Sequence, residues 1–104
     1  MNGTIRVHHS RLKNTLSEIG KMGWPVPKIQ TCSDNSDIVI LYWDDETERN
    51  PSPSKGKGTF IFVSTADALE DILKMFTEKG YHDPRIQILP ESEFHDFELI
   101  YQQK

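Results

Sequence analysis

The chain has 104 residues, and its 16 acidic side chains against 12 basic ones give a formal net charge of -4. This length predicts one small domain over residues 1–104, with a hydrophobic core of its own. The acidic balance argues against a nucleic-acid partner, because a phosphate backbone is recognised by clustered lysine and arginine.

The first predicted elements are a strand and a helix. Residues 4–8 alternate Ile5 and Val7 with polar side chains, which predicts a half-buried strand. Apolar residues then recur with helical spacing, and Gly23 can end the helix; they are Leu12, Leu16, Ile19 and Met22. The two prolines that follow cannot continue a helix. We therefore expect a loop or an irregular edge segment up to residue 36.

Two strands and a long loop form the predicted centre of the fold. Residues 37–43 and 58–64 are rich in β-branched and aromatic side chains, and their apolar positions are nearly continuous. Such runs are typical of central strands. We expect the two strands to pair as a hairpin that projects a mobile loop at residues 44–57.

A second helix and a fourth strand follow. The helix pattern, with Ser64 or Thr65 as cap and Gly80 as stop, has apolar side chains at Leu69, Ile72, Leu73 and Phe76. Residues 85–89 alternate as a strand that Pro90 ends. The tail fits a helix through Phe94, Phe97 and Tyr101, or a strand through Phe97, Leu99 and Tyr101.

This order of elements predicts an α+β fold, the ferredoxin-like βαββαβ sandwich. One antiparallel four-stranded sheet would carry two helices on one face, and a C-terminal helix or strand would be added. No internal repeat of useful length is visible in the sequence. Apolar side chains on the bare face of the sheet would indicate oligomer packing; the aromatic candidates are Tyr42, Trp43, Phe60 and Phe62.

The sequence also bears on the compartment. The longest apolar run, residues 38–43, is far shorter than the roughly 20 residues that cross a bilayer. Residues 1–4 lead into an alternating segment without the core of a signal peptide. Cys32 is the one cysteine of the sequence, so no internal disulfide can form. We therefore expect a cytoplasmic protein without a membrane partner.

The loop at residues 44–57 is the most unusual segment for function. Its first part is acidic and its last part is basic. A carboxylate cluster can hold a hard divalent cation, and a Lys-Gly-Lys-Gly sequence can offer donors to a phosphate. The plainer alternative is a solvated loop without a ligand.

Cys32, His82 and His95 supply donor types that zinc or copper accept. No Cys-x-x-Cys or His-x-x-x-His spacing accompanies them, and His8 and His9 are adjacent on a strand, so their side chains point to opposite faces.

The sequence also contains no Gly-x-Ser-x-Gly elbow, the turn that carries the nucleophile of many hydrolases. We therefore predict a protein that is not an enzyme.

The stretch Tyr-His-Asp-Pro-Arg-Ile-Gln-Ile-Leu-Pro at residues 81–90 resembles the Tyr-x-x-Pro-x-Ile-x-x-Leu-Pro stretch of the CutA divalent-cation-tolerance family. An acidic hairpin loop and other landmarks follow a similar order over residues 32–101; they are Cys32, Tyr42, Trp43, Ser64 and Thr65. The chain departs from the family at residues 24–31, which replace a segment of the Ala-Ala-Cys-Val kind.

The resemblance implies a ferredoxin-like fold similar to that of the PII signalling proteins, a homo-oligomer with the trimer favoured, and a divalent metal ion as cofactor. The implied metal ligands, together with the loop carboxylates, are Cys32, His82, Asp44, Asp45 and Glu46. The residues expected to contact a ligand or partner are Trp43, Tyr81, Glu48, Lys55 and Lys57.

These observations lead us to expect a small non-enzymatic binding or regulatory protein. It would hold a metal ion or a small ligand in a cleft between subunits and respond through residues 44–57. The alternative is an acidic protein–protein interaction module or inhibitor that acts on a protein partner without a ligand. Calorimetry with divalent cations and nucleotides separates the two, because the alternative predicts no heat.

Overall fold

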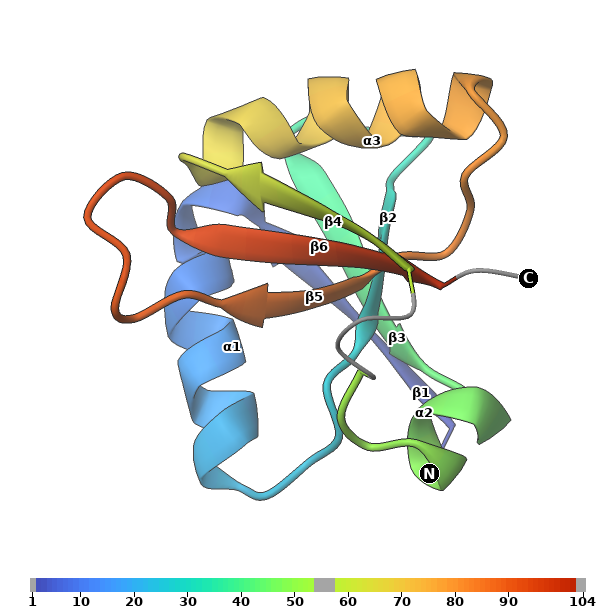
Figure 1. Cartoon of the computed structure of the whole chain (residues 1–104), viewed down its shortest axis with the longest axis vertical. Helices are drawn as coiled ribbons and strands as arrows, with labels where there is room; N and C mark the ends of the chain where they lie inside the picture. Colours follow the sequence, from blue (N-terminus) through green and yellow to red (C-terminus); the bar gives the residue numbers. More distant parts are fainter. Residues whose placement is uncertain (1, 54–57, 103–104) are drawn as a thin grey trace.

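A computed structural model describes residues 2–53 and 58–102 and shows an α+β fold (Figure 1). The strands within these residues are β1 (Gly3–His8), β2 (Lys28–Thr31), β3 (Ile38–Trp43), β4 (Gly58–Val63), β5 (Arg85–Ile88) and β6 (Phe97–Gln102). The helices are α1 (Leu12–Lys21), α2 (Asp45–Arg49) and α3 (Leu69–Glu78), with short 3₁₀ turns η1 (His9–Arg11) and η2 (Ala66–Ala68). None of these helices is long and apolar enough to cross a membrane.

The described strands form one antiparallel sheet in the order β1-β3-β2-β5-β6-β4. The prediction that β3 and β4 pair as a hairpin is wrong. Both edges of β3 already pair, with β1 and β2, so it has no free edge for β4, which pairs with β6 instead.

The sheet has six strands in the described part of the chain, so the four-stranded ferredoxin-like arrangement is not confirmed. One additional strand is β2, in the segment expected to be a loop or an irregular edge. The other is β6, which decides the open question of the tail in favour of a strand. Five consecutive residues of β6 are buried, and a strand buried on both faces loses the alternation that identifies strands in a sequence.

The sheet consists of two halves with the same chain path. Each half reads strand, 3₁₀ turn, helix, strand, strand, and in each half the last strand lies between the other two. Backbone hydrogen bonds repeat 57 residues further along the chain: Trp24 N–H donates to Ile19 O at 3.2 Å, and Tyr81 N–H donates to Phe76 O at 2.9 Å. The expectation of no internal repeat is therefore wrong. At this offset the sequence itself has a few identical pairs, among them Gly23 with Gly80 and Pro27 with Pro84.

The centre of this repeat is the pairing of β2 with β5. Lys28 lies opposite Arg85, and the flanking hydrogen bonds are equivalent: Ile29 N–H donates to Pro84 O, and Ile86 N–H donates to Pro27 O, both at 3.0 Å. A pseudo-twofold axis therefore passes between the two halves at this point.

One core lies between the helices and one face of the sheet. α1 packs against β5 and α3 packs against β2, so each helix covers a strand of the other half. The predicted helical faces are confirmed except at Met22, which lies just after α1 and is 56% exposed. The fully or nearly fully buried side chains of these faces are Leu12, Leu16, Ile19, Leu69 and Leu73. Both helices are followed by a glycine with positive φ, Gly23 at 78° and Gly80 at 97°. Glycine adopts this left-handed conformation more easily than other residues.

Of the segment 44–57 that was expected to be a mobile loop, residues 54–57 lie outside the described residues, and the described part contains α2. Asp44 caps this helix in a capping box with Thr47, whose backbone N–H donates to Asp44 Oδ1 at 3.1 Å. Side chains from the second face of the sheet reach this segment, so it covers the middle of that face. The expected exposed apolar face is therefore reduced mainly to Phe62, which is 54% exposed, while Trp43 lies in the core.

Candidate functional site

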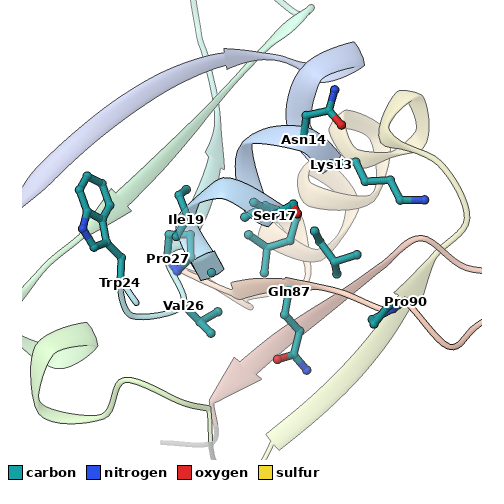
Figure 2. A pocket seen from close by; sticks show the side chains of 13 residues that line it. Lys13, Asn14, Ser17, Ile19, Trp24, Val26, Pro27, Gln87 and Pro90 are labelled. Carbon is teal, nitrogen blue, oxygen red and sulfur yellow. The ribbon is translucent and has the colours of Figure 1, made fainter. Parts of the chain in front are cut away.

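A cavity of about 610 Å³ opens beneath α1 at the point where β5 parts from β2 (Figure 2). We call it the α1–β5 cavity. Its lining is mainly apolar, and the principal apolar side chains are Leu16, Ile19, Trp24, Pro27, Ile86 and Ile88. Its size falls in the range of small-molecule binding sites, and polar side chains at its edge can orient a ligand.

The α1–β5 cavity lies along the edge of a strand. Three consecutive residues of β5 line it, Ile86, Gln87 and Ile88. Since successive side chains of a strand point to opposite faces, a cavity on one face would contact every second residue. The edge is open here because β2 pairs with β5 only where Lys28 faces Arg85.

The backbone of Ile88 points into this opening. Ile86 N–H donates to Pro27 O, away from β6, whereas Leu89 N–H donates to Asp96 O, in the direction of β6. Backbone groups alternate in direction along an antiparallel strand, so those of Ile88 point the same way as those of Ile86. Ile88 lies opposite Phe97 in the pairing with β6, at a position where this alternation turns its backbone groups away from β6. Outside the strand ladders and the helices, no backbone hydrogen bond among the described residues uses the N–H of Ile88.

A much smaller pocket lies at the equivalent place, between α3 and β2. Its volume is about 210 Å³, and it is lined in the same way by consecutive residues of β2 and by α3. Thr77 stands there at the position of Gly20, and Asp83 at the position of Val26. One backbone plan therefore produces a wide apolar cavity between α1 and β5 and a narrow, more polar one between α3 and β2.

One side of the α1–β5 cavity is formed by residues 24–27, which we call the proline wall. Trp43 supports it from behind: its indole Nε1 donates to Pro25 O at 2.8 Å, and its ring meets Trp24 edge to face at 5.5 Å. Val26 N–H donates to Pro51 O at 3.0 Å. The proline wall is therefore attached to residues 50–53, which we call the segment after α2.

Arg85 strengthens this attachment. Its side chain is 1% exposed, and its guanidinium donates to the carbonyl oxygens of Val26, Asn50 and Pro51. Burial lowers the pKa of Arg85 from its ordinary value. The buried cation thus joins the cavity wall, the sheet and the segment after α2.

Lys28, 6% exposed, lies beside Arg85 in the sheet. Its ammonium is 2.8 Å from Asp44 Oδ2 and 2.6 Å from Glu46 Oε2. Burial alone would lower the pKa of Lys28, but hydrogen bonds and charge from the two carboxylates outweigh it and raise that pKa. Burial alone would likewise raise the pKa of Asp44, but Lys28 and the Thr47 N–H lower it.

The structure does not bring the residues proposed as metal ligands together. Asp44 and Glu46 contact a lysine ammonium where a metal ion was expected, and Asp45 is exposed in the first turn of α2. Among the described residues, no group of three or more histidine, cysteine and acidic side chains has the geometry to hold a metal ion.

The other two predicted metal ligands lie elsewhere. Arg6 Nη2 is 2.9 Å from the Sγ of buried Cys32. A hydrogen bond from the backbone of Asp34 is the main cause that lowers the pKa of this thiol, and Arg6 adds to it against the opposing effect of burial. His82 lines the smaller pocket between α3 and β2.

The residues predicted to contact a ligand are also dispersed. Trp43 supports the proline wall but does not line the cavity, and Tyr81 packs against Phe76 and Tyr101. Glu48 is exposed on α2. Lys55 and Lys57 lie outside the described residues.

Sequence reasoning missed the residues that line the α1–β5 cavity. The available signal was on α1, where the small residues Ser17 and Gly20 fall three positions apart beside the apolar stripe. A Cβ at Gly20 would meet no atom within 4 Å, so this position opens onto free space. Two prolines in residues 24–27 were a second signal, since they restrict the pairing of that segment.

No protein-family model, no curated protein and no solved structure matches this chain. The geometry of the α1–β5 cavity is therefore the basis for a function. The resemblance of residues 81–90 to the CutA family stays a prediction.

Proposed function

We propose that this chain is a small binding protein, not an enzyme, and that its site is the α1–β5 cavity. The observation that carries the proposal is the contrast between the two equivalent places, about 610 Å³ against about 210 Å³. A hollow with an apolar lining is costly to leave in contact with water. A role in binding explains why the α1–β5 cavity is wide, although the same backbone arrangement forms a narrower pocket between α3 and β2.

The lining favours an apolar ligand that carries one negative group. Among the described residues that line the cavity, Lys13 is the one with a charged side chain. Its Nζ lies 3.5 Å from Asp96 Oδ1, but the two side chains are 59% and 42% exposed, and an ion pair that is open to water contributes little free energy. A carboxylate or sulfonate on a ligand can therefore replace Asp96 at Lys13, while Asn14 and Gln87 offer neutral hydrogen-bonding groups.

The regulatory part of the proposal concerns the segment after α2. Val26 is bonded both to Pro51 and to Arg85, and Arg85 also reaches Asn50. A ligand that displaces the proline wall would strain these hydrogen bonds and shift the segment between its bound and released states. We propose the described part of the expected loop, residues 44–53, as the responsive element.

The finer expectations belong to the same proposal: a ferredoxin-like relative of the CutA family, cytoplasmic, and assembled as a trimer. Light scattering measures the mass of the assembly directly. A divalent metal ion is not included, because Lys28 already supplies the positive charge at Asp44 and Glu46.

A fluorescent probe tests the proposal. 8-Anilino-1-naphthalenesulfonate combines an aromatic body with one negative group, and its emission reports transfer to an apolar site. The wild-type chain should bind it at one site. Gly20→Leu places a side chain in the open space of the cavity and should weaken binding by about tenfold or more, a loss of about 1.4 kcal/mol.

The matched control is Thr77→Leu, at the equivalent position on α3, which should leave binding unchanged. Leucine is a better helix former than glycine, so Gly20→Leu is compatible with α1. Equal affinity of the probe for all three proteins would contradict the proposal.

A second candidate is the acidic interaction module. Phe62 and Phe94 are 54% and 78% exposed. Phe62 lines a shallow hollow together with the exposed Glu91, and the exposed Glu93 and Phe94 follow shortly after Glu91 in the chain. This surface fits a basic amphipathic partner. Calorimetric titration with a synthetic helix of leucine and lysine should give heat with the wild-type chain and none with Phe94→Ser, and equal heats would remove this candidate.

A further inference from the structure

The strand edge in the α1–β5 cavity indicates the class of ligand, and the inference rests on the proposed function of that cavity. We infer that the ligand is an extended peptide segment, which adds a strand to β5 at Ile88. The first support is the direction of the Ile88 backbone groups, which point away from β6 and toward the cavity. An exposed strand edge of this kind pairs readily with another chain.

The second support is that the proline wall cannot pair with this edge. Pro25 and Pro27 have no backbone N–H. The carbonyl of Pro27 accepts from Ile86, and that of Pro25 accepts from Trp43.

Val26, between the two prolines, is committed as well. Its N–H donates to Pro51 O, and its carbonyl accepts from Arg85. From Pro25 to Pro27, each backbone N–H group of the segment that faces the edge is therefore either absent or hydrogen-bonded, and each carbonyl already accepts a hydrogen bond. The edge at Ile88 is left for a partner from outside these residues.

The third support is the distribution of side chains around the edge. A strand beside β5 would direct alternate side chains toward the apolar lining at Leu16 and Ile19, and the others away from it. Lys13 at the rim favours an acidic residue in the peptide (Figure 2). The expected segment is short and extended, with a large apolar residue close to an aspartate or glutamate.

A displayed library of random seven-residue peptides tests this inference. Peptides are selected on the wild-type chain after removal of those that bind Gly20→Leu. The enriched peptides should share an apolar and an acidic residue. Lys13→Glu should weaken their binding by about tenfold or more, whereas Lys74→Glu on the exposed face of α3 should not change it.

The hydrogen bonds themselves are tested with the best peptide. Hydrogen exchange of the Ile88 amide should slow by about tenfold or more on binding, and N-methylation of alternate peptide amides should abolish the effect. Gln87 serves as the control, because its amide already points to β6. Unchanged exchange at Ile88, or a library that yields no binder sensitive to Gly20→Leu, would overturn the inference.

The two proposals fail in different ways. If the anilinonaphthalene probe binds in a manner sensitive to Gly20→Leu but no peptide does, the cavity is a small-molecule site and the peptide inference is wrong. If neither the probe nor any peptide distinguishes Gly20→Leu from the wild-type chain, the proposed site itself is wrong.

Discussion

Replacing Arg85 with methionine should destabilise the fold strongly. The guanidinium is buried and serves three carbonyl oxygens, on Val26, Asn50 and Pro51. Methionine keeps an unbranched apolar stem but leaves these acceptors without a donor. A buried group that loses its partner costs about 1–3 kcal/mol, and the relief of burying a charge offsets part of the total. We expect a net loss of about 3 kcal/mol in the free energy of unfolding.

Calorimetry and urea unfolding measure this loss. In a chain of this length, 1 kcal/mol corresponds to a change in melting temperature of about 4–8 °C, so Arg85→Met should melt about 12–24 °C lower. Lys74→Met is the control, because Lys74 is exposed and its pair with Glu70 contributes at most about 0.5 kcal/mol. A decrease below about 4 °C for Arg85→Met would refute the reasoning that this side chain holds the segment after α2 to the sheet.

Gly58→Ala should lower the melting temperature, because Gly58 has a φ of 151° and the added Cβ would collide with the carbonyl oxygen of Tyr101. Gly3→Ala, at the equivalent start of β1, is the control and should leave the melting temperature unchanged, because no atom lies within 4 Å of its added Cβ. Tyr101→Phe should leave the free energy of unfolding unchanged or raise it by about 1 kcal/mol, because its buried hydroxyl has no hydrogen-bond partner among the described residues. The pKa of Asp44 is lowered and that of Lys28 is raised. Their mutual stabilisation is therefore full between about pH 5 and pH 9, and is lost below about pH 4 as Asp44 protonates and above about pH 10.5 as Lys28 deprotonates. The difference in melting temperature between the wild-type chain and Lys28→Met should narrow at both extremes.

The two long helices could be predicted from the sequence because their pattern and their burial have the same cause. Side chains three and four residues apart share one face of a helix, so the apolar spacing of Leu12, Leu16 and Ile19 directly marks the face that joins the core. Gly23 and Gly80 mark the ends for an equally local reason, since each adopts positive φ.

Strand pairing could not be predicted in the same way. The composition of β3 and β4 identifies strands, but it contains no information about the partner of each edge. β2 escaped detection because it has four residues, follows two prolines and contains one aliphatic residue, Ile29. Its insertion between β3 and β5 changes the whole strand order.

One buried lysine lies where the sequence predicts a metal ion. Lysine is almost never fully buried unless it is paired, so nothing in the sequence marked Lys28 as the partner of Asp44 and Glu46. The α1–β5 cavity was equally hidden, because it joins α1 to the edge of a strand more than 60 residues away in the chain.

The most direct test of the central claim is a set of amide and indole NMR spectra recorded during titration with 8-anilino-1-naphthalenesulfonate. We predict that the largest shifts occur at Gly20, at the indole of Trp24 and at Ile88, with none at Thr77 or His82. Shifts concentrated at Phe62 and Phe94 instead, or spread over both halves of the molecule, would contradict the assignment of the α1–β5 cavity as the binding site.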